Sequence, residues 1–238
     1  MNTSIFSIQR AYYDQVYRGR SDASSLDRLC QLHAIRRCLG MIYLPPEAKI
    51  LELGCGTGAL AGELSRWGAV TGVDLSPEAV RLAQAAHPQV RFHAANFLDD
   101  PALGNGYHLI VAQEVLAHVQ TPDQPRMIQL LYEKLAPGGS VILTTPNRDV
   151  VERFTLAPES VPPVQHWLNR GELASLLHPC FRVVALTTAC FFQPFFRRHP
   201  VLNWWRYLWY CRLHGLAMTE NLLARSPSGA YLCCLAQR

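Results

Sequence analysis

Residues 50–58 read ILELGCGTG, so an apolar run leads directly into three glycines spaced two apart. Sixteen positions further on, the run VTGVD ends in an acidic residue, Asp74. A strand that breaks into a glycine turn leaves bare backbone, against which a ligand can lie. A carboxylate at the end of the next strand can accept hydrogen bonds from two ribose hydroxyls. The two stretches together predict a pocket for a nucleoside-containing cofactor.

The size and composition of the chain indicate one folded domain. Its 238 residues suffice for a single well-packed core, and 49% of them are hydrophobic while 17% are charged. The formal net charge is +4, but the tight basic clusters are only the pairs Arg36-Arg37 and Arg197-Arg198. A basic stripe of the kind that binds nucleic acid is therefore not evident, and no nucleic-acid partner is expected.

The chain carries no sequence signal for export or for a metal-binding cysteine motif. The N-terminus has no basic segment followed by an apolar core, and no apolar stretch reaches the length of a membrane-spanning helix. None of the eight cysteines forms a Cys-x-x-Cys pair, and Cys233 and Cys234 are neighbours in an apolar run. We expect a cytoplasmic protein with reduced thiols.

Strand and helix patterns alternate through the middle of the chain. Apolar runs predict strands, and amphipathic patterns, with Ser76 as a cap and Pro77 at the first helical position, predict helices. Residues 137–139 (PGG) are expected to end a helix just before the fifth strand. This alternation predicts an α/β fold with a mostly parallel sheet covered on both faces. The expected strands are 50–53, 70–73, 90–93, 108–112 and 140–145, and the expected helices are 59–67, 77–86 and 127–135.

The C-terminal part of the chain has a different pattern. Residues 182–187 and 230–235 both have the pattern of strands, and the long segment between them is rich in Phe, Trp and Tyr. A final hairpin interrupted by an insert fits this pattern. We therefore divide the single domain into an N-terminal helical segment (1–45), a cofactor-binding core (46–189), an aromatic-rich insert (190–228) and the last strand (229–238).

Four sequence blocks resemble the class I S-adenosylmethionine-dependent methyltransferases, in order and in spacing. They are ELGCGTG (52–58), EVLAHV (114–119), LAPGG (135–139) and LTTPN (143–147). Within this family, the chain is similar to the group that contains the quinone and small-molecule O-methyltransferases. The resemblance covers roughly residues 49–181. It implies a Rossmann-like, seven-stranded sheet with an antiparallel last strand, and S-adenosylmethionine as the cofactor.

The resemblance also implies the cofactor-binding residues. The glycines admit the methionine and ribose parts, Glu52 takes the cationic amino group, and Asp74 takes the ribose diol. Asn96 stands where the family usually has Asp, and can accept from the adenine amino group only through its neutral carbonyl. The expected set is Glu52, Gly54, Cys55, Gly56, Gly58, Asp74, Leu75, Asn96, Phe97 and Gln113.

A dinucleotide-dependent dehydrogenase is the main competing interpretation of the glycine loop. Its fingerprint requires Gly-x-Gly-x-x-Gly, in which the third glycine packs the helix on the strand. Here the spacing is Gly-x-Gly-x-Gly, and no second nucleotide-binding half follows. We therefore set this interpretation aside.

Two histidines are candidates for the base that deprotonates an acceptor, because an unperturbed imidazole titrates near neutral pH. His118 follows the fourth strand at the ligand-binding edge of the sheet. His166 lies in a run, QHWL, that resembles a family segment before a helix. The alternative for each is a structural histidine that fixes a loop. Glu114, His118 and His166 could also hold a cation, but some relatives have a second Glu where this chain has Ala117, so we predict no metal.

The two ends of the chain are the expected acceptor pocket. Tyr12, Tyr13 and Tyr17 lie on one expected helix, which the resemblance suggests is a lid, although an ordinary packed helix is as plausible. The aromatic insert suits a hydrophobic acceptor or peripheral contact with a membrane, or it simply covers the sheet edge. We expect methyl transfer to oxygen of a hydrophobic small molecule, such as a phenol, quinone precursor or polyketide-like metabolite. The alternatives are N- or C-methylation, 2′-O-methylation of RNA 3′ ends, and a non-catalytic cofactor-binding module.

Overall fold

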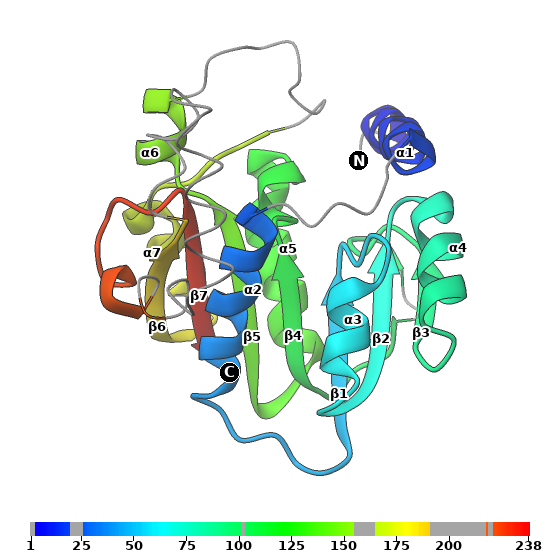
Figure 1. Cartoon of the computed structure of the whole chain (residues 1–238), viewed down its shortest axis with the longest axis horizontal. Helices are drawn as coiled ribbons and strands as arrows, with labels where there is room; N and C mark the ends of the chain where they lie inside the picture. The colour runs from blue at the N-terminus through cyan, green and yellow to red at the C-terminus, as the bar shows by residue number, and fades with distance from the viewer. Residues whose placement is uncertain (1–2, 20–25, 101–102, 155–164, 191–217, 219–220) are drawn as a thin grey trace.

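The computed structural model describes residues 3–19, 26–100, 103–154, 165–190, 218 and 221–238, which form a helix-covered sheet (Figure 1). Most of the aromatic insert predicted at 190–228 lies outside these residues. The described helices are α1 (Thr3–Gly19), α2 (Leu26–Leu39), α3 (Ala59–Leu64), α4 (Pro77–Ala86), α5 (Gln124–Lys134), α6 (Arg148–Phe154) and α7 (Arg170–Leu177), with the 3-10 turns η2 (Leu116–His118) and η3 (Thr121–Asp123).

Seven strands form one sheet in the order β3-β2-β1-β4-β5-β7-β6. Strand β7 pairs antiparallel with both β5 and β6, and the other pairings are parallel. The predicted fold class, with its antiparallel last strand, is confirmed. The strands are β1 (Ala48–Leu53), β2 (Gly68–Asp74), β3 (Arg91–Ala94), β4 (Tyr107–Gln113), β5 (Leu135–Pro146), β6 (Arg182–Ala189) and β7 (Tyr231–Gln237).

Alternate residues of the central strands point to opposite faces and build two separate cores. Ile50 of β1 packs with α2 and α3, whereas its neighbour Leu51 packs with α5 and α7. Leu109 and Ile110 of β4 divide in the same way. Because both faces are covered, these strands are continuous apolar runs in the sequence.

The fifth strand differs from its prediction. Residues 137–139 were expected to precede it, but β5 begins at Leu135, directly after α5, and includes them. Its pairing with β4 shifts register between Tyr107 and Leu109, and Gly138 has a positive φ of 75°. The glycines thus allow an irregular strand where a break was expected.

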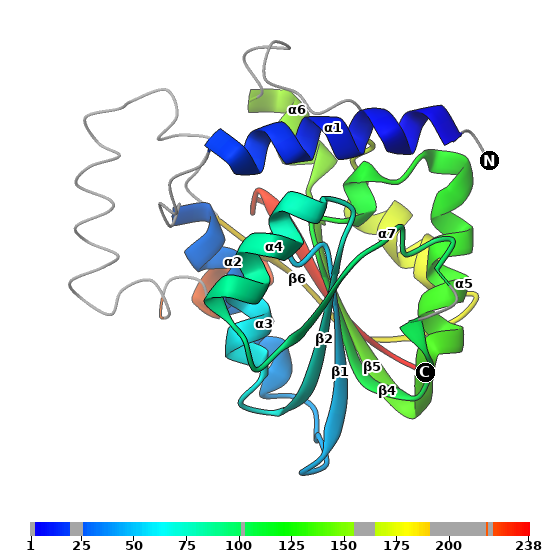
Figure 2. The ribbon, with the colours of Figure 1, turned by 90° about the vertical axis from the view of Figure 1, so that its right-hand side faces the viewer.

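Local capping fixes the helices next to the sheet's carboxyl edge. The Ser76 hydroxyl accepts a hydrogen bond from Ala79 N (3.1 Å), and Pro77 occupies the first helical position, as the sequence predicts. Helix α1 lies across the same edge (Figure 2). Among the described residues, no helix is both long and apolar enough to cross a bilayer.

We expect replacement of Leu131 in the α5 face of the core to destabilise the fold. Its side chain is fully buried, so Leu131→Ala should lower the free energy of unfolding by about 2–5 kcal/mol, measured by urea denaturation. Leu222→Ala is the matched control, because that leucine is 72% exposed and its truncation should change stability by less than about 0.5 kcal/mol. Equal effects of the two changes would contradict this account of the core.

Candidate functional site

A cavity of about 990 Å³ lies at the carboxyl edge of the sheet, between the strand ends and helices α1 and α2. This volume is at the upper end of the range for small-molecule sites, so it has room for a cofactor and an acceptor together. Nine of the ten cofactor-binding residues expected from the sequence line it. They are Glu52, Gly54, Cys55, Gly56, Asp74, Leu75, Asn96, Phe97 and Gln113.

The glycine loop leaves β1 in a conformation that other residues rarely adopt. Gly54 and Gly56 have φ values of 67° and 51°. A Cβ at Gly54 would lie 2.6 Å from Val115 Cγ2, and one at Gly56 would lie 2.8 Å from Tyr17 Oη. Both positions therefore need glycine for their backbone and for the space above it.

Gly58, the third glycine, does not line the cavity. A Cβ there would lie 2.8 Å from Phe92 Cζ and 3.0 Å from Ala83 Cβ, so this glycine packs α3 against α4 and β3. Asn96 does line the cavity, but its carbonyl accepts from Leu98 N (3.2 Å) and its amide donates to Asp99 Oδ2 (2.7 Å). The side chain of Asn96 is thus already oriented by its own turn.

The carboxylate of Asp74 joins two loops. Its Oδ2 accepts from Gly56 N and its Oδ1 from Ser76 N, each at 2.9 Å. Burial raises the pKa of Asp74, while these backbone N–H groups act in the opposite direction. A carboxylate has about four acceptor positions, so Asp74 can accept further hydrogen bonds from a ligand hydroxyl.

Glu52 is the most perturbed acid of the site. Glu52 is only 2% exposed. Burial, and secondly the nearby Asp74 carboxylate, raise its pKa well above the usual range, whereas Arg28 lowers it. Its Oε2 has no hydrogen-bond partner among the described residues. A buried, unpaired carboxylate oxygen beside bare glycine backbone fits a cationic amino group, so the residues present suit the amino-acid part of S-adenosylmethionine.

A polar network built on Gln31 was not predicted from the sequence. This residue of α2 is buried, donates to Glu114 Oε1, and accepts from Gln113 Nε2 (3.2 Å) and Thr144 Oγ1 (3.1 Å). Glu114 has a positive φ of 59°, which is strained for a non-glycine residue. The network fixes the polar ends of β4 and β5 beside the cavity, and no local motif marks Gln31.

Helix α1 closes the cavity on the side away from the strands. Residues at helical spacing line it, and hydrogen bonds hold the helix to the segment between β2 and α4. Arg10 Nε donates to Leu75 O (3.1 Å), and Asp14 accepts from the Ser76 hydroxyl and from Glu78 N (3.3 Å). The face of α1 that lines the cavity, called the inner face below, consists of Phe6, Gln9, Tyr12, Tyr13, Val16 and Tyr17.

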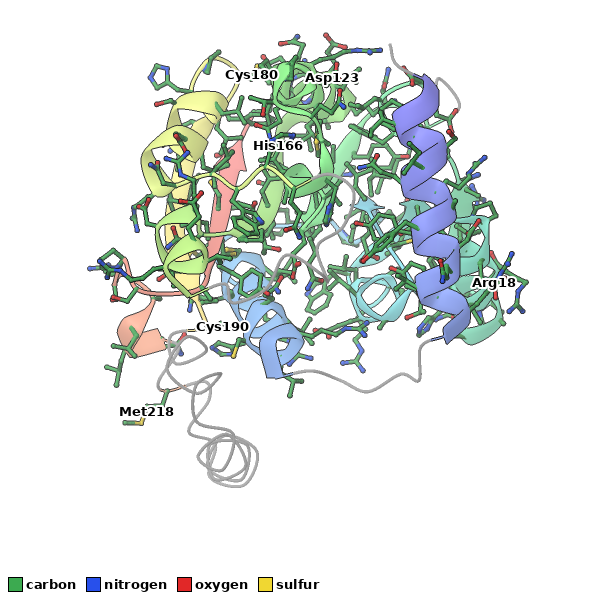
Figure 3. All side chains as sticks on the ribbon, turned by 90° about the horizontal axis from the view of Figure 1, so that it is seen from above. Arg18, Asp123, His166, Cys180, Cys190 and Met218 are labelled. Atoms are coloured by element: carbon green, nitrogen blue, oxygen red, sulfur yellow. The ribbon has the colours of Figure 1, made fainter. Side chains whose placement is uncertain are left out.

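The two candidate bases occupy different positions. His118 lines the cavity, and its backbone carbonyl accepts from Gln9 Nε2 at 2.8 Å. His166 is not among the lining residues, and its backbone N donates to Ala117 O at 2.8 Å. Seen from above, His166 lies between α1 and α7 (Figure 3). Among the described residues, no three His, Cys, Asp or Glu side chains are grouped so as to hold a metal ion.

Comparison with known sequences gives a family for this fold and site. The methyltransferase-domain family matches residues 23–213. A ubiquinone biosynthesis O-methyltransferase of Methylobacterium sp. (strain 4-46) is 32% identical over 161 residues, which cover 61% of this chain and 64% of that protein. The matched part of the chain therefore spans less than two thirds of this curated relative.

Solved structures share the fold at low sequence identity. The N-methyltransferase NodS of Bradyrhizobium japonicum WM9 has a TM-score of 0.66 and 15% identity, covering 97% of this chain and 98% of its own. The magnesium protoporphyrin IX methyltransferase of Synechocystis PCC 6803 has a TM-score of 0.64 and 16% identity, covering 98% and 99%. At such identities the likeness concerns the fold alone.

Fold and site together define a class I, S-adenosylmethionine-dependent methyltransferase. The chain belongs to the methyltransferase-domain family that matches most of its length.

The buried Glu52 gives a pH-dependent prediction. Folding raises the pKa of Glu52, so the protonated Glu52 carboxyl contributes to the stability of the folded state below about pH 4.5. This contribution is lost as the pH rises toward the folded-state pKa of Glu52. Glu52→Gln should therefore remove part of this decline and make the ligand-free protein more stable than wild type at pH 8. The same variant should bind S-adenosylhomocysteine at least tenfold more weakly, on the order of one lost charge-assisted hydrogen bond.

Melting temperatures from pH 5 to 8 and calorimetric titration measure the two effects separately. Glu133→Gln, at an exposed position of α5, is the matched control and should change neither. A Glu52→Gln protein that is less stable than wild type at pH 8 would show that the buried Glu52 carboxylate does not destabilise the fold.

Proposed function

We propose that the chain transfers a methyl group from S-adenosylmethionine to an oxygen atom of a hydrophobic small molecule, such as a phenol or a quinone precursor. The observation that carries this proposal is that one cavity brings His118 and the aromatic inner face together with Glu52, Asp74 and the glycine loop. The similarity to ubiquinone biosynthesis O-methyltransferases supports oxygen as the methylated atom.

The cofactor-binding half of the cavity has a role for each acid. The unpaired Glu52 oxygen accepts from the cationic amino group, and the remaining acceptor positions of Asp74 accept from the ribose hydroxyls. Burial raises the pKa of the Cys55 thiol, with smaller contributions from the Glu52 and Asp74 carboxylates. The thiol therefore stays protonated and does not compete as a nucleophile.

The cofactor supplies an electrophilic methyl group on a sulfonium. The protein must then orient the acceptor oxygen opposite the sulfur, exclude water and remove the acceptor proton. In the transfer, the bond from oxygen to the methyl carbon forms as the bond from sulfur to that carbon breaks. We assign the released proton to the imidazole of His118, and we assign to α1 the exclusion of water.

His166 receives a supporting role in this proposal. Its backbone N–H holds the Ala117 carbonyl, one residue before His118, so it fixes the turn that presents the imidazole. The side chain of His166 is outside the cavity and is not assigned a proton transfer.

Calorimetric titration with S-adenosylmethionine tests the cofactor half of the proposal. Wild type should bind, and Asp74→Ala should lose at least tenfold in affinity, because the diol loses its acceptors and the glycine loop loses its anchor. Asp149→Ala, at an exposed position in the first turn of α6, is the control. Circular dichroism confirms that each variant is folded. Undiminished binding by a folded Asp74→Ala protein would contradict this assignment.

Replacement of His118 tests the catalytic half. His118→Gln should lower kcat about 10²- to 10⁴-fold at neutral pH on any phenol that wild type methylates, and rising pH should partly restore it, since the acceptor then ionises unaided. His166→Gln keeps its backbone hydrogen bond and should lower kcat by less than tenfold. His178→Gln, at an exposed position, is the control. Full turnover by the His118→Gln protein would contradict the assignment of His118 as the base.

A further inference from the structure

Tyr13 occupies the boundary between the two halves of the cavity. On the inner face of α1, Gln9 lies one turn before it and bonds the His118 carbonyl, whereas Tyr17 lies one turn after it, with its hydroxyl over Gly56. Tyr13 therefore lies between the proposed base and the glycine loop, where an acceptor must meet the methyl group.

The ring of Tyr13 is held from two sides. Its edge-to-face contact with His118 has a centroid separation of 5.7 Å, and that with Tyr12 has one of 5.2 Å. Such contacts favour one ring orientation. The side chain is thus fixed beside the imidazole instead of extending into solvent.

The hydroxyl of Tyr13 is the one part of this side chain that the protein leaves unsatisfied. It is buried, and it has no hydrogen-bond partner among the described residues. A buried hydroxyl without a partner is destabilising, so the position is better explained by a ligand that completes it.

The surroundings determine what this hydroxyl can do. Burial raises the pKa of Tyr13, and the neighbouring tyrosines and then the carboxylates of Asp74 and Glu114 raise it further. The group therefore stays protonated at neutral pH and can act as a hydrogen-bond donor. A donor of this kind suits an oxygen atom that becomes negatively charged.

We propose that the Tyr13 hydroxyl donates a hydrogen bond to the acceptor oxygen and holds it beside the His118 imidazole. This inference rests on the proposed O-methyl transfer and adds a residue that touches the acceptor. The hydrogen bond lowers the pKa of the bound phenol while His118 takes its proton, so the two side chains share the activation of one oxygen atom. The amino-acid carboxylate of the cofactor is the competing partner.

The test uses 4-nitrocatechol, a phenol whose absorption changes on ionisation, bound together with S-adenosylhomocysteine. Tyr13→Phe removes only the hydroxyl, so it should raise the apparent pKa of the bound phenol by about one unit and lower kcat/KM for its methylation about tenfold to a hundredfold. Its affinity for S-adenosylhomocysteine should stay within about twofold of wild type. Tyr43→Phe, at an 85% exposed position, is the control and should change none of these values.

Each other outcome overturns a defined part of the proposal. If Tyr13→Phe weakens S-adenosylhomocysteine but not 5′-methylthioadenosine, which lacks the amino acid, the hydroxyl serves the cofactor carboxylate. If wild type binds and methylates the phenol and Tyr13→Phe does so equally well, the Tyr13 role alone is wrong. If wild type binds the cofactor but no phenol, both the phenol acceptor of the proposed function and the role of Tyr13 fall together.

Discussion

The site depends on the hydrogen bonds that the Asp74 carboxylate accepts. The carboxylate accepts from the backbone of the glycine loop through Gly56 and from the start of the next helix through Ser76. Gly54 N and Cys55 N both donate to Val73 O, the carbonyl just before it, so the loop is tied to β2 at three points. Because these bonds are buried, the loop is rigid before any ligand binds, and binding need not spend free energy on ordering it.

The same turn anchors α1. The Ser76 hydroxyl caps α4 through Ala79 N and donates to Asp14, while Leu75 O accepts from Arg10. One short segment at the end of β2 therefore holds Asp74, the helix that follows, and the helix that closes the cavity. A defect at the end of β2 is therefore expected to affect the glycine loop, α4 and α1 together.

The sequence predicts best what is local. The glycine spacing, Asp74 and the Ser76 cap follow from patterns within a few residues. The seven-stranded sheet with an antiparallel last strand, which the family resemblance implies, is confirmed. Gln31 could not be found from local patterns, because its partners are 82, 83 and 113 positions away. The Gln9 contact with His118 spans 109 positions. The extent of β5 was missed because Leu135 already pairs with Tyr107, and residues 137–139 form an irregularity within the strand instead of preceding it.

The division between local and distant contacts matches a division of labour in the cavity. The residues that we assign to the cofactor come from the strand ends and their turns, which the fold holds in place. Helix α1 is instead fixed mostly through backbone atoms of other segments: Leu75 O, Glu78 N and His118 O. Contacts to backbone atoms persist when the side chains around them change. Apart from Gln9, the side chains of the inner face make none of these contacts, so they can vary with the acceptor while α1 stays in place. One cofactor site can in this way serve many acceptors on this fold.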